Sequence, residues 1–186
     1  MLGDKRGAIE DFNRAIQLQP SNAETYNNRG VAKFSLGDNA GAIDDFSHTL
    51  QLQPNFVMAY NNRGLARSFL GNKKGAIDDY SQAIQRQPDF AIAYNNRGLA
   101  QFDLGNHKEA IVNYNQAIEL QPDFAEAFFN RGMAKSALGD ASGAIADFDQ
   151  TLKLRPDFAA YICRQSEGDR RLYPTVQPNG TRPSRC

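Results

Sequence analysis

The sequence predicts an all-α protein built from repeated pairs of helices, and three observations lead to that class. Prolines recur every 34 residues, at Pro20, Pro54, Pro88, Pro122 and Pro156. Aromatic residues and glycines keep the same spacing, at Tyr26, Tyr60, Tyr94 and Phe128 and at Gly37, Gly71, Gly105 and Gly139. Between them, apolar residues follow the helical period, as in Ala42, Ile43, Phe46 and Leu50. A fixed period of this length is typical of repeat architectures.

Each repeat is expected to contain two helices. In the first full unit the first helix covers about 23–36 and ends at Gly37, where glycine permits a left-handed stop. The second helix covers about 40–53 and ends before Pro54. Helix starts are predicted at three capping boxes: Ser21 with Glu24, Asn106 with Glu109, and Asp123 with Glu126. The units are 1–22, which holds a second helix only, then 23–56, 57–90, 91–124 and 125–158.

The C-terminal part departs from the repeat. We expect a degenerate capping helix at 159–167 and a disordered tail at 168–186, which is rich in Pro, Gly and Arg. Five arginines against Glu167 and Asp169 give 159–186 a net charge of +3. The whole chain has a formal net charge of zero, so the repeats carry about −3. Zero net charge argues against nucleic acid or an anionic membrane as the partner.

Composition also argues against several classes of site. Two Cys and two His cannot form a zinc site of the usual spacing, so no metal or cofactor is expected. No catalytic cluster or phosphate-binding loop stands out, and the expected function is non-enzymatic. No apolar run approaches the ~18 residues of a membrane span. The start, MLGDKRGAIE, lacks the apolar core of a signal peptide, and a cytoplasmic location is expected.

The repeat resembles the tetratricopeptide repeat (TPR) family over about 1–158. In the second unit the matching positions are Tyr60, Gly64, Leu70, Gly71, Ala76, Ile77, Tyr80, Ala83 and Pro88. The resemblance implies a right-handed solenoid of antiparallel helix pairs, with a concave groove lined by the first helix of each unit. It also implies binding of a protein or peptide, without catalysis.

The stretch YNNRG occurs at Tyr26–Gly30, Tyr60–Gly64 and Tyr94–Gly98, with FFNRG at Phe128–Gly132. Successive helical side chains turn by about 100°, so Tyr and Gly point toward the packing side and Asn toward the groove. We expect the glycines to allow close approach of the partner helix at Ala42, Ala76, Ala110 and Ala144. Tyr60 and the second-helix aromatics Phe46, Tyr80, Tyr114 and Phe148 are then expected in the core.

The arginines of this stretch point away from the groove. We expect the arginine row, Arg29, Arg63, Arg97 and Arg131, to pair with an acidic row on the second helices, at Asp11, Asp45, Asp79 and Asp147. That acidic row has a gap at Asn113, so an arginine beside the third unit is expected to lack its partner. A ladder of arginines for phosphate or an acidic partner is the alternative.

The asparagines are the candidate ligand contacts, in an edge row (Asn28, Asn62, Asn96, Asn130) and a central row (Asn27, Asn61, Asn95). One amide can bracket a peptide bond, because it offers both donors and an acceptor. In some TPR arrays such a ladder grips the ligand's main chain. The alternative is that the asparagines solvate an exposed face or bond adjacent helices. Side-chain pockets are expected at Met58, Leu65, Ile92, Leu99, Phe129 and Met133.

The groove chemistry favours a neutral-to-basic protein or peptide. Its predicted lining includes Glu24, Asp103 and Glu126 but no Lys or Arg, which disfavours the chaperone-binding type of TPR domain. An RNA-binding helical repeat is a less favoured alternative, because it needs a basic or stacking groove. Another alternative is that the repeats belong to a larger multidomain protein. The half unit leaves Phe12 partly uncovered, which indicates self-association through this end or an upstream helix.

Overall fold

The computed structural model describes residues 2–158, and in that range the chain forms nine α-helices and one 3-10 helix, with no strand. They are α1 (Leu2–Leu18), α2 (Ala23–Ser35), α3 (Asn39–Leu52), α4 (Val57–Phe69), α5 (Lys73–Arg86), α6 (Ala91–Asp103), α7 (His107–Leu120), α8 (Ala125–Ala137), α9 (Ala141–Leu154) and η1 (Pro156–Phe158). The all-α prediction is confirmed. The predicted capping helix at 159–167 and the tail at 168–186 lie outside the described residues.

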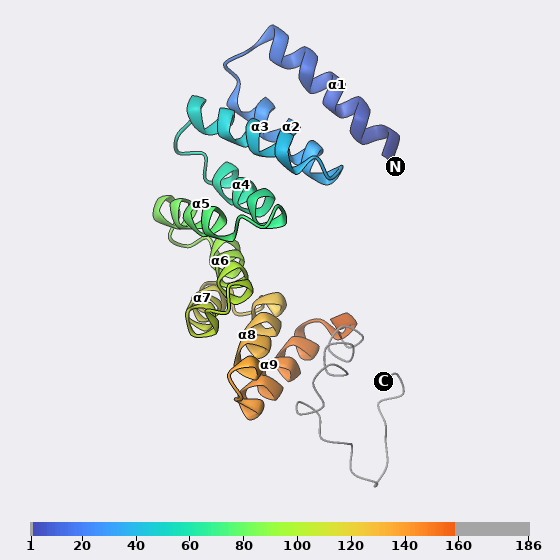
Figure 1. The fold of residues 1–186 in the computed structure, drawn as a ribbon. Coiled ribbons are helices and arrows are strands. Elements are labelled where there is room, and N and C mark those ends of the chain that lie inside the picture. The colour runs from blue at the N-terminus through green and yellow to red at the C-terminus, as the bar shows by residue number, and fades with distance from the viewer. Residues whose placement is uncertain (1, 159–186) are drawn as a thin grey trace.

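The helices stack in chain order into a curved column (Figure 1). Each helix packs on the next, most extensively within the pairs α2–α3, α4–α5, α6–α7 and α8–α9. The first helices α2, α4, α6 and α8 also contact one another in succession, which places them along one inner face. The chain is therefore a solenoid in which each unit buries its apolar surface on its neighbours.

Each predicted glycine stop is present. Gly37 has φ +85° and Gly71 has φ +81°, in the left-handed region that ordinary side chains avoid. The following residue starts the next helix: the side chain of Asp38 accepts a hydrogen bond from the Gly41 N–H at 2.9 Å. The same short turn therefore ends one helix and caps the next.

The three predicted capping boxes are wrong. The N-cap of α2 is Asn22, which accepts from the Thr25 N–H at 3.2 Å, rather than Ser21. Helix α8 begins after Phe124 without a side-chain cap. Helix α7 does begin after Asn106, but the side-chain amide of Asn106 donates to Gln101 Oε1 instead of capping the helix.

The core is a row of aromatic rings from the second helices. Phe46, Tyr80, Tyr114 and Phe148 are each at most 2% exposed. A Cβ atom on Gly64 would lie 2.7 Å from Cε1 of Tyr80, and Gly30, Gly98 and Gly132 meet the corresponding rings equally closely. The glycines therefore accommodate a ring, and the prediction that they accommodate the partner-helix alanines is corrected.

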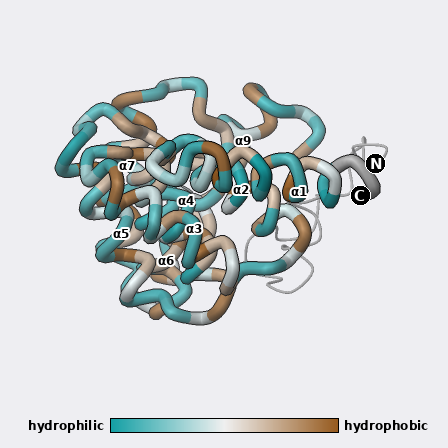
Figure 2. The backbone as a smooth tube through the Cα atoms, turned by 90° about the horizontal axis from the view of Figure 1, so that it is seen from above, coloured by the Kyte–Doolittle hydropathy of each residue, from teal (hydrophilic) through white to brown (hydrophobic). Residues whose placement is uncertain are grey.

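Phe46, Tyr80 and Tyr114 also join their units to the next one. Tyr80 packs with Ala76 of its own helix and with Ala100 of α6. Figure 2 shows hydrophobic and hydrophilic residues alternating along the helices, as this packing between two neighbours requires. Tyr60, predicted to be core, is only half-buried, and the Arg86 guanidinium lies 4.4 Å from its ring centroid.

Candidate functional site

The inner face of the first helices carries exposed apolar side chains. Met58, Ile92 and Leu99 remain 41–46% exposed, and Leu65 and Met133 are half-buried. These side chains lie on three successive first helices, α4, α6 and α8, which contact one another. An apolar row of this kind is a feature of interaction surfaces.

The two asparagine rows differ in burial. Asn27, Asn61 and Asn95 are 3–8% exposed, whereas Asn62 and Asn96 are half-buried. The rows are joined between units: Asn96 Nδ2 donates to Asn61 Oδ1 at 2.9 Å. Asn130 repeats this bond to Asn95, also at 2.9 Å. The amides therefore bond neighbouring first helices to each other, which is the alternative to ligand binding that the sequence left open for them.

The bond between the asparagine rows is absent at the first pair of units, between α2 and α4. Asn27 Oδ1 is buried, and none of the described residues donates a hydrogen bond to it. Asn62, which stands where Asn96 and Asn130 stand in the later units, makes no such bond. The Asn27 amide instead donates to Asn28 Oδ1 at 3.4 Å. An unsatisfied buried carbonyl costs about 1–3 kcal/mol, so a donor at this place would be stabilising.

A cavity of about 550 Å³ opens at the C-terminal end of this face. Its lining comes from α6, α7, α8 and η1: Asn95, Leu99, Phe102, Tyr114, Glu126, Phe129, Asn130, Met133, Asp157 and Phe158. Phe129, which takes the place of a central-row asparagine, is 7% exposed and stacks near Phe148 and Phe158. Predicted pocket residues Leu99, Phe129 and Met133 thus meet in one cavity.

Tyr114 was predicted only as a core aromatic, but it also places a polar group in this cavity wall. Its hydroxyl is fully buried and has no hydrogen-bond partner among the described residues. Burial raises the pKa of Tyr114, so the hydroxyl stays protonated. In the sequence Tyr80 and Tyr114 stand where the other units have Phe46 and Phe148, and these two hydroxyls were the available signal.

A smaller cavity, about 310 Å³, lies between α4, α5 and α6. It contains Lys73, whose ammonium group donates to Asp103 and to Ser68 Oγ. The statement that the groove contains no Lys or Arg is therefore corrected, since a second helix contributes one cation. That cation is already paired with an acidic groove residue.

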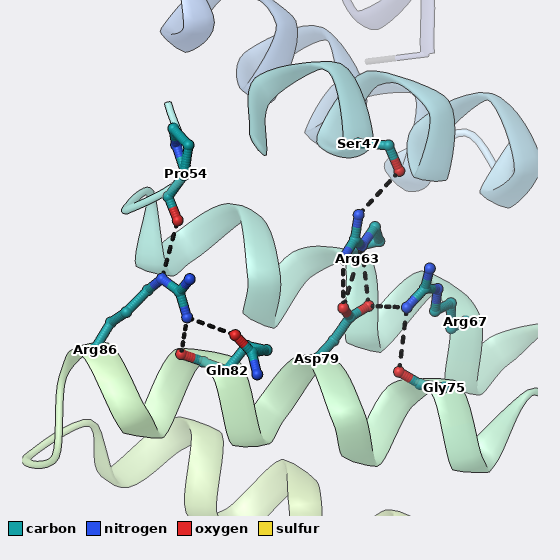
Figure 3. A network of polar contacts seen from close by, with 8 residues as sticks. All are labelled: Ser47, Pro54, Arg63, Arg67, Gly75, Asp79, Gln82 and Arg86. Carbon is teal, nitrogen blue, oxygen red and sulfur yellow. Dashed lines mark hydrogen bonds and ion pairs between the residues drawn. The ribbon is translucent and has the colours of Figure 1, made fainter. Parts of the chain in front are cut away.

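Arg29, Arg63 and Arg131 behind the groove bind carboxylates, as predicted, and Figure 3 shows the site of Arg63. Arg63 donates from Nε and Nη2 to both oxygens of Asp79, which is 2% exposed, and Arg67 reaches the same carboxylate at 2.8 Å. Asp45 and Asp147 are held in the same way by Arg29 with Lys33 and by Arg131 with Lys135. These ion pairs lock the first helix of a unit to its second helix.

Two positions depart from this arrangement. Asp11 does not join the arginine row, and its only ion pair among the described residues is an exposed contact with Arg14 at 3.8 Å. Arg97 lacks a carboxylate, as predicted, and its Nε donates to Asn113 Oδ1 at 2.7 Å. Burial lowers the pKa of Arg97, whereas the hydrogen bond that Arg29 donates to Asp45 raises the pKa of Arg29.

Within residues 2–158, no three His, Cys, Asp or Glu side chains gather closely enough to hold a metal ion. His48 packs 4.1 Å from the Tyr26 ring and His107 packs 4.9 Å from the Phe102 ring, measured between centroids. In the same range, none of the helices has the length and apolar character needed to cross a membrane.

Known proteins resemble this chain in sequence and in fold. Models of the tetratricopeptide repeat match residues 23–56, 91–124 and 113–146, and a further TPR repeat model matches 2–37 and 70–105. No curated protein shows a significant match to the sequence.

Solved structures with the same architecture include MamA, which is 29% identical, with a TM-score of 0.77 over 86% of this chain and 93% of MamA. The first TPR of Spaghetti (RPAP3), bound to the HSP90 peptide SRMEEVD, is 27% identical, with a TM-score of 0.62 over 63% of this chain and 93% of its own. YrrB, described as a TPR protein with an unusual peptide-binding site, is 20% identical, with a TM-score of 0.72 over 88% of this chain and 84% of YrrB.

Repeat models cover most of the described helices, and the solved structures reproduce their stacking. The chain therefore belongs to the tetratricopeptide repeat family, with the right-handed helical solenoid of that family.

Proposed function

We propose that this chain is a non-enzymatic scaffold that binds an extended peptide along the inner face of α2, α4, α6 and α8. The observation that supports it is the row of exposed apolar side chains, Met58, Ile92 and Leu99, which leads into the 550 Å³ cavity. Leu65, Phe129 and Met133 complete the side-chain pockets. An extended chain fits this surface, because the apolar sites recur once per unit.

In this proposal the asparagines bind the ligand backbone, and the edge row makes the direct contacts. Asn96 uses one N–H to bind Asn61, and it keeps a second N–H and its carbonyl oxygen for a peptide bond. Asn130 is placed in the same way by Asn95. Asn28 and Asn62 extend the row toward the N-terminus. In the buried central row, Asn61 and Asn95 accept these bonds from Asn96 and Asn130, whereas Asn27 donates to Asn28.

The expected ligand is a neutral-to-basic peptide of a partner protein. Glu24 and Glu126 belong to the inner helices, and Lys73, which lines a groove cavity, is neutralised by Asp103. Spaghetti's first TPR supports a peptide as the class of ligand. Its bound sequence, SRMEEVD, has three acidic residues to one arginine, and an acidic peptide would meet repulsion in the groove of this chain.

The test is selection from a displayed random peptide library, followed by calorimetry with the synthesised peptides. We expect the selection to yield neutral or basic peptides. Their affinity for the Asn96→Ala and Asn130→Ala variants should be about tenfold or more lower than for the original chain. Leu99→Asp should abolish binding of apolar peptides, since it places a charge among the pockets.

Asn55→Ala is the matched control, because Asn55 is an exposed loop asparagine outside the helices. It should leave affinity unchanged. Selected peptides that bind all four variants as tightly as the original chain would contradict the proposal, as would a clear selection for acidic peptides.

A further inference from the structure

The third unit has an arginine whose binding capacity is only partly used. Arg29, Arg63 and Arg131 each direct Nε and Nη2 at an aspartate sixteen residues later. Arg97 meets a neutral amide instead: Nε donates to Asn113 and Nη1 donates to Ser81 Oγ at 3.2 Å. Among the described residues, Arg97 Nη2 has no hydrogen-bond acceptor. This nitrogen is accessible from the surface, so a ligand can reach it.

A cavity of about 320 Å³ opens beside this guanidinium, between α5, α6 and α7. It is lined by Ile77, Ser81, Arg97, Gln101, Glu109, Val112 and Asn113. Arg97 is two residues beyond Asn95 and so lies about 200° around α6 from it. The cavity is therefore on the opposite side of α6 from the peptide groove.

A second hydrogen-bond donor is available in this cavity. Gln101 accepts from Asn106 through Oε1, and its amide nitrogen has no acceptor among the described residues. In the other units this position is Lys33, Arg67 or Lys135, each of which binds the buried aspartate. The third unit thus keeps two donors and lacks the carboxylate that the other units supply.

We propose that this cavity binds the carboxylate of an aspartate or glutamate side chain from a partner protein. Arg97 Nη2 and the Gln101 amide donate to its two oxygens, and the exposed Val112, 67% accessible, contacts the apolar stem. The incoming group takes the role that Asp45, Asp79 and Asp147 have within their own units. This site is separate from the proposed peptide groove and takes a ligand of the opposite charge preference.

The surrounding charge favours a single negative charge over a doubly charged phosphate. Glu109 also lines the cavity, and it makes no ion pair with Arg97. Its carboxylate repels an incoming anion, and the repulsion is larger for a dianion. A single partly desolvated guanidinium forms strong charge-assisted hydrogen bonds with a monoanion at short range, as in the buried ion pairs of the other units.

The test follows the Arg97 Nε–Hε signal by NMR during titration with acetyl-Leu-Glu-Leu-amide. The Arg97→Lys variant assigns the signal by its disappearance. We expect the signal to shift with this peptide and not with acetyl-Leu-Gln-Leu-amide. The Arg29, Arg63 and Arg131 signals are internal controls and should not move, since their carboxylates are already in place.

Two variants make the result decisive. Asn113→Asp supplies the internal carboxylate of the other units, and it should weaken peptide binding about tenfold or more while keeping the fold. Glu109→Gln should strengthen binding, because it removes the repelling charge. The proposal is overturned if the glutamate peptide moves no Arg97 signal in either the original chain or Glu109→Gln, or if Asn113→Asp binds as tightly as the original. Inorganic phosphate binding more tightly than the peptide, or acetate binding equally well, would overturn the assignment to a protein side chain.

Discussion

Gly64 shows how a single absent methyl group allows a helix pair to close. Alanine is the better helix former by about 1 kcal/mol, but its Cβ would lie 2.7 Å from the ring of Tyr80, which is 1% exposed and would have to shift within the core. Overpacking of this kind costs about 1–3 kcal/mol. We therefore expect Gly64→Ala to lower the free energy of unfolding by up to about 2 kcal/mol, measured by urea denaturation.

Gly7→Ala is the matched control, because nothing lies within 4 Å of the added Cβ in α1. It should be neutral or stabilising by up to about 1 kcal/mol. Equal responses of the two variants would show that helix propensity, and not the ring, determines the cost at Gly64.

Residue roles could be predicted where the spacing constrained them. The pairing of Arg63 with Asp79 followed from one repeated separation between two charged rows, and the gap at Asn113 followed from the same comparison. The bond between Asn96 and Asn61 could not be predicted in this way, although it was among the alternatives. Helical direction places an amide on a face, but it does not show whether solvent or the neighbouring unit takes its hydrogen bonds.

The ion pairs act at the level of the helix pair. In Asp79→Asn, Arg63 and Arg67 lose the carboxylate that both of them bind, in a site where the carboxylate is 3% exposed. Breaking a buried pair while its partners remain costs about 3–5 kcal/mol. We expect Asp79→Asn to lower the unfolding free energy by an amount near the lower end of that range, because Asn113 shows that an amide can still accept one bond.

Asp11→Asn tests the same change at an exposed pair. Both partners of the Asp11–Arg14 contact are 77% exposed, and surface pairs contribute about 0–1 kcal/mol. Chemical denaturation of the two variants should separate them clearly. Similar losses would mean that the buried aspartates do not lock the helix pairs.

Helix ends were predictable at their stops but not at their starts. The stops depend on one backbone conformation at glycine, whereas a cap depends on room for its side chain. A Cβ on Gly41 would lie 2.3 Å from Asp38 Oδ2, so the Asp38 cap as it is placed leaves no room for a Cβ three residues later. Glu109 has a Cβ at the equivalent position, and Asn106 starts α7 without capping it, whereas Asn22 does cap α2 with Thr25 at that position. The capping-box pattern alone contains no information about this clash.

For the whole molecule, the period of the sequence was sufficient to predict the architecture. A helix pair with a fixed repeat can bury its apolar face only on its neighbours, so the stacked array follows from spacing alone. The cavities were less predictable, because second helices also contribute to them. Lys73 and Tyr114 enter the inner cavities from α5 and α7, outside the faces that helical direction assigns to the groove.

In a stacked array, stability should vary along the chain, because each unit contacts only its neighbours. None of the side chains described in α1 is fully buried, whereas α5 buries Ala76, Asp79, Tyr80 and Ala83 between α4 and α6. We expect native-state hydrogen exchange, measured at increasing denaturant, to show α1 amides opening at a much lower free energy than those of α5. In Gly64→Ala the protection of α5 should fall while that of α1 stays unchanged. Equal protection of α1 and α5, lost together in this variant, would instead show that the units unfold as one cooperative block.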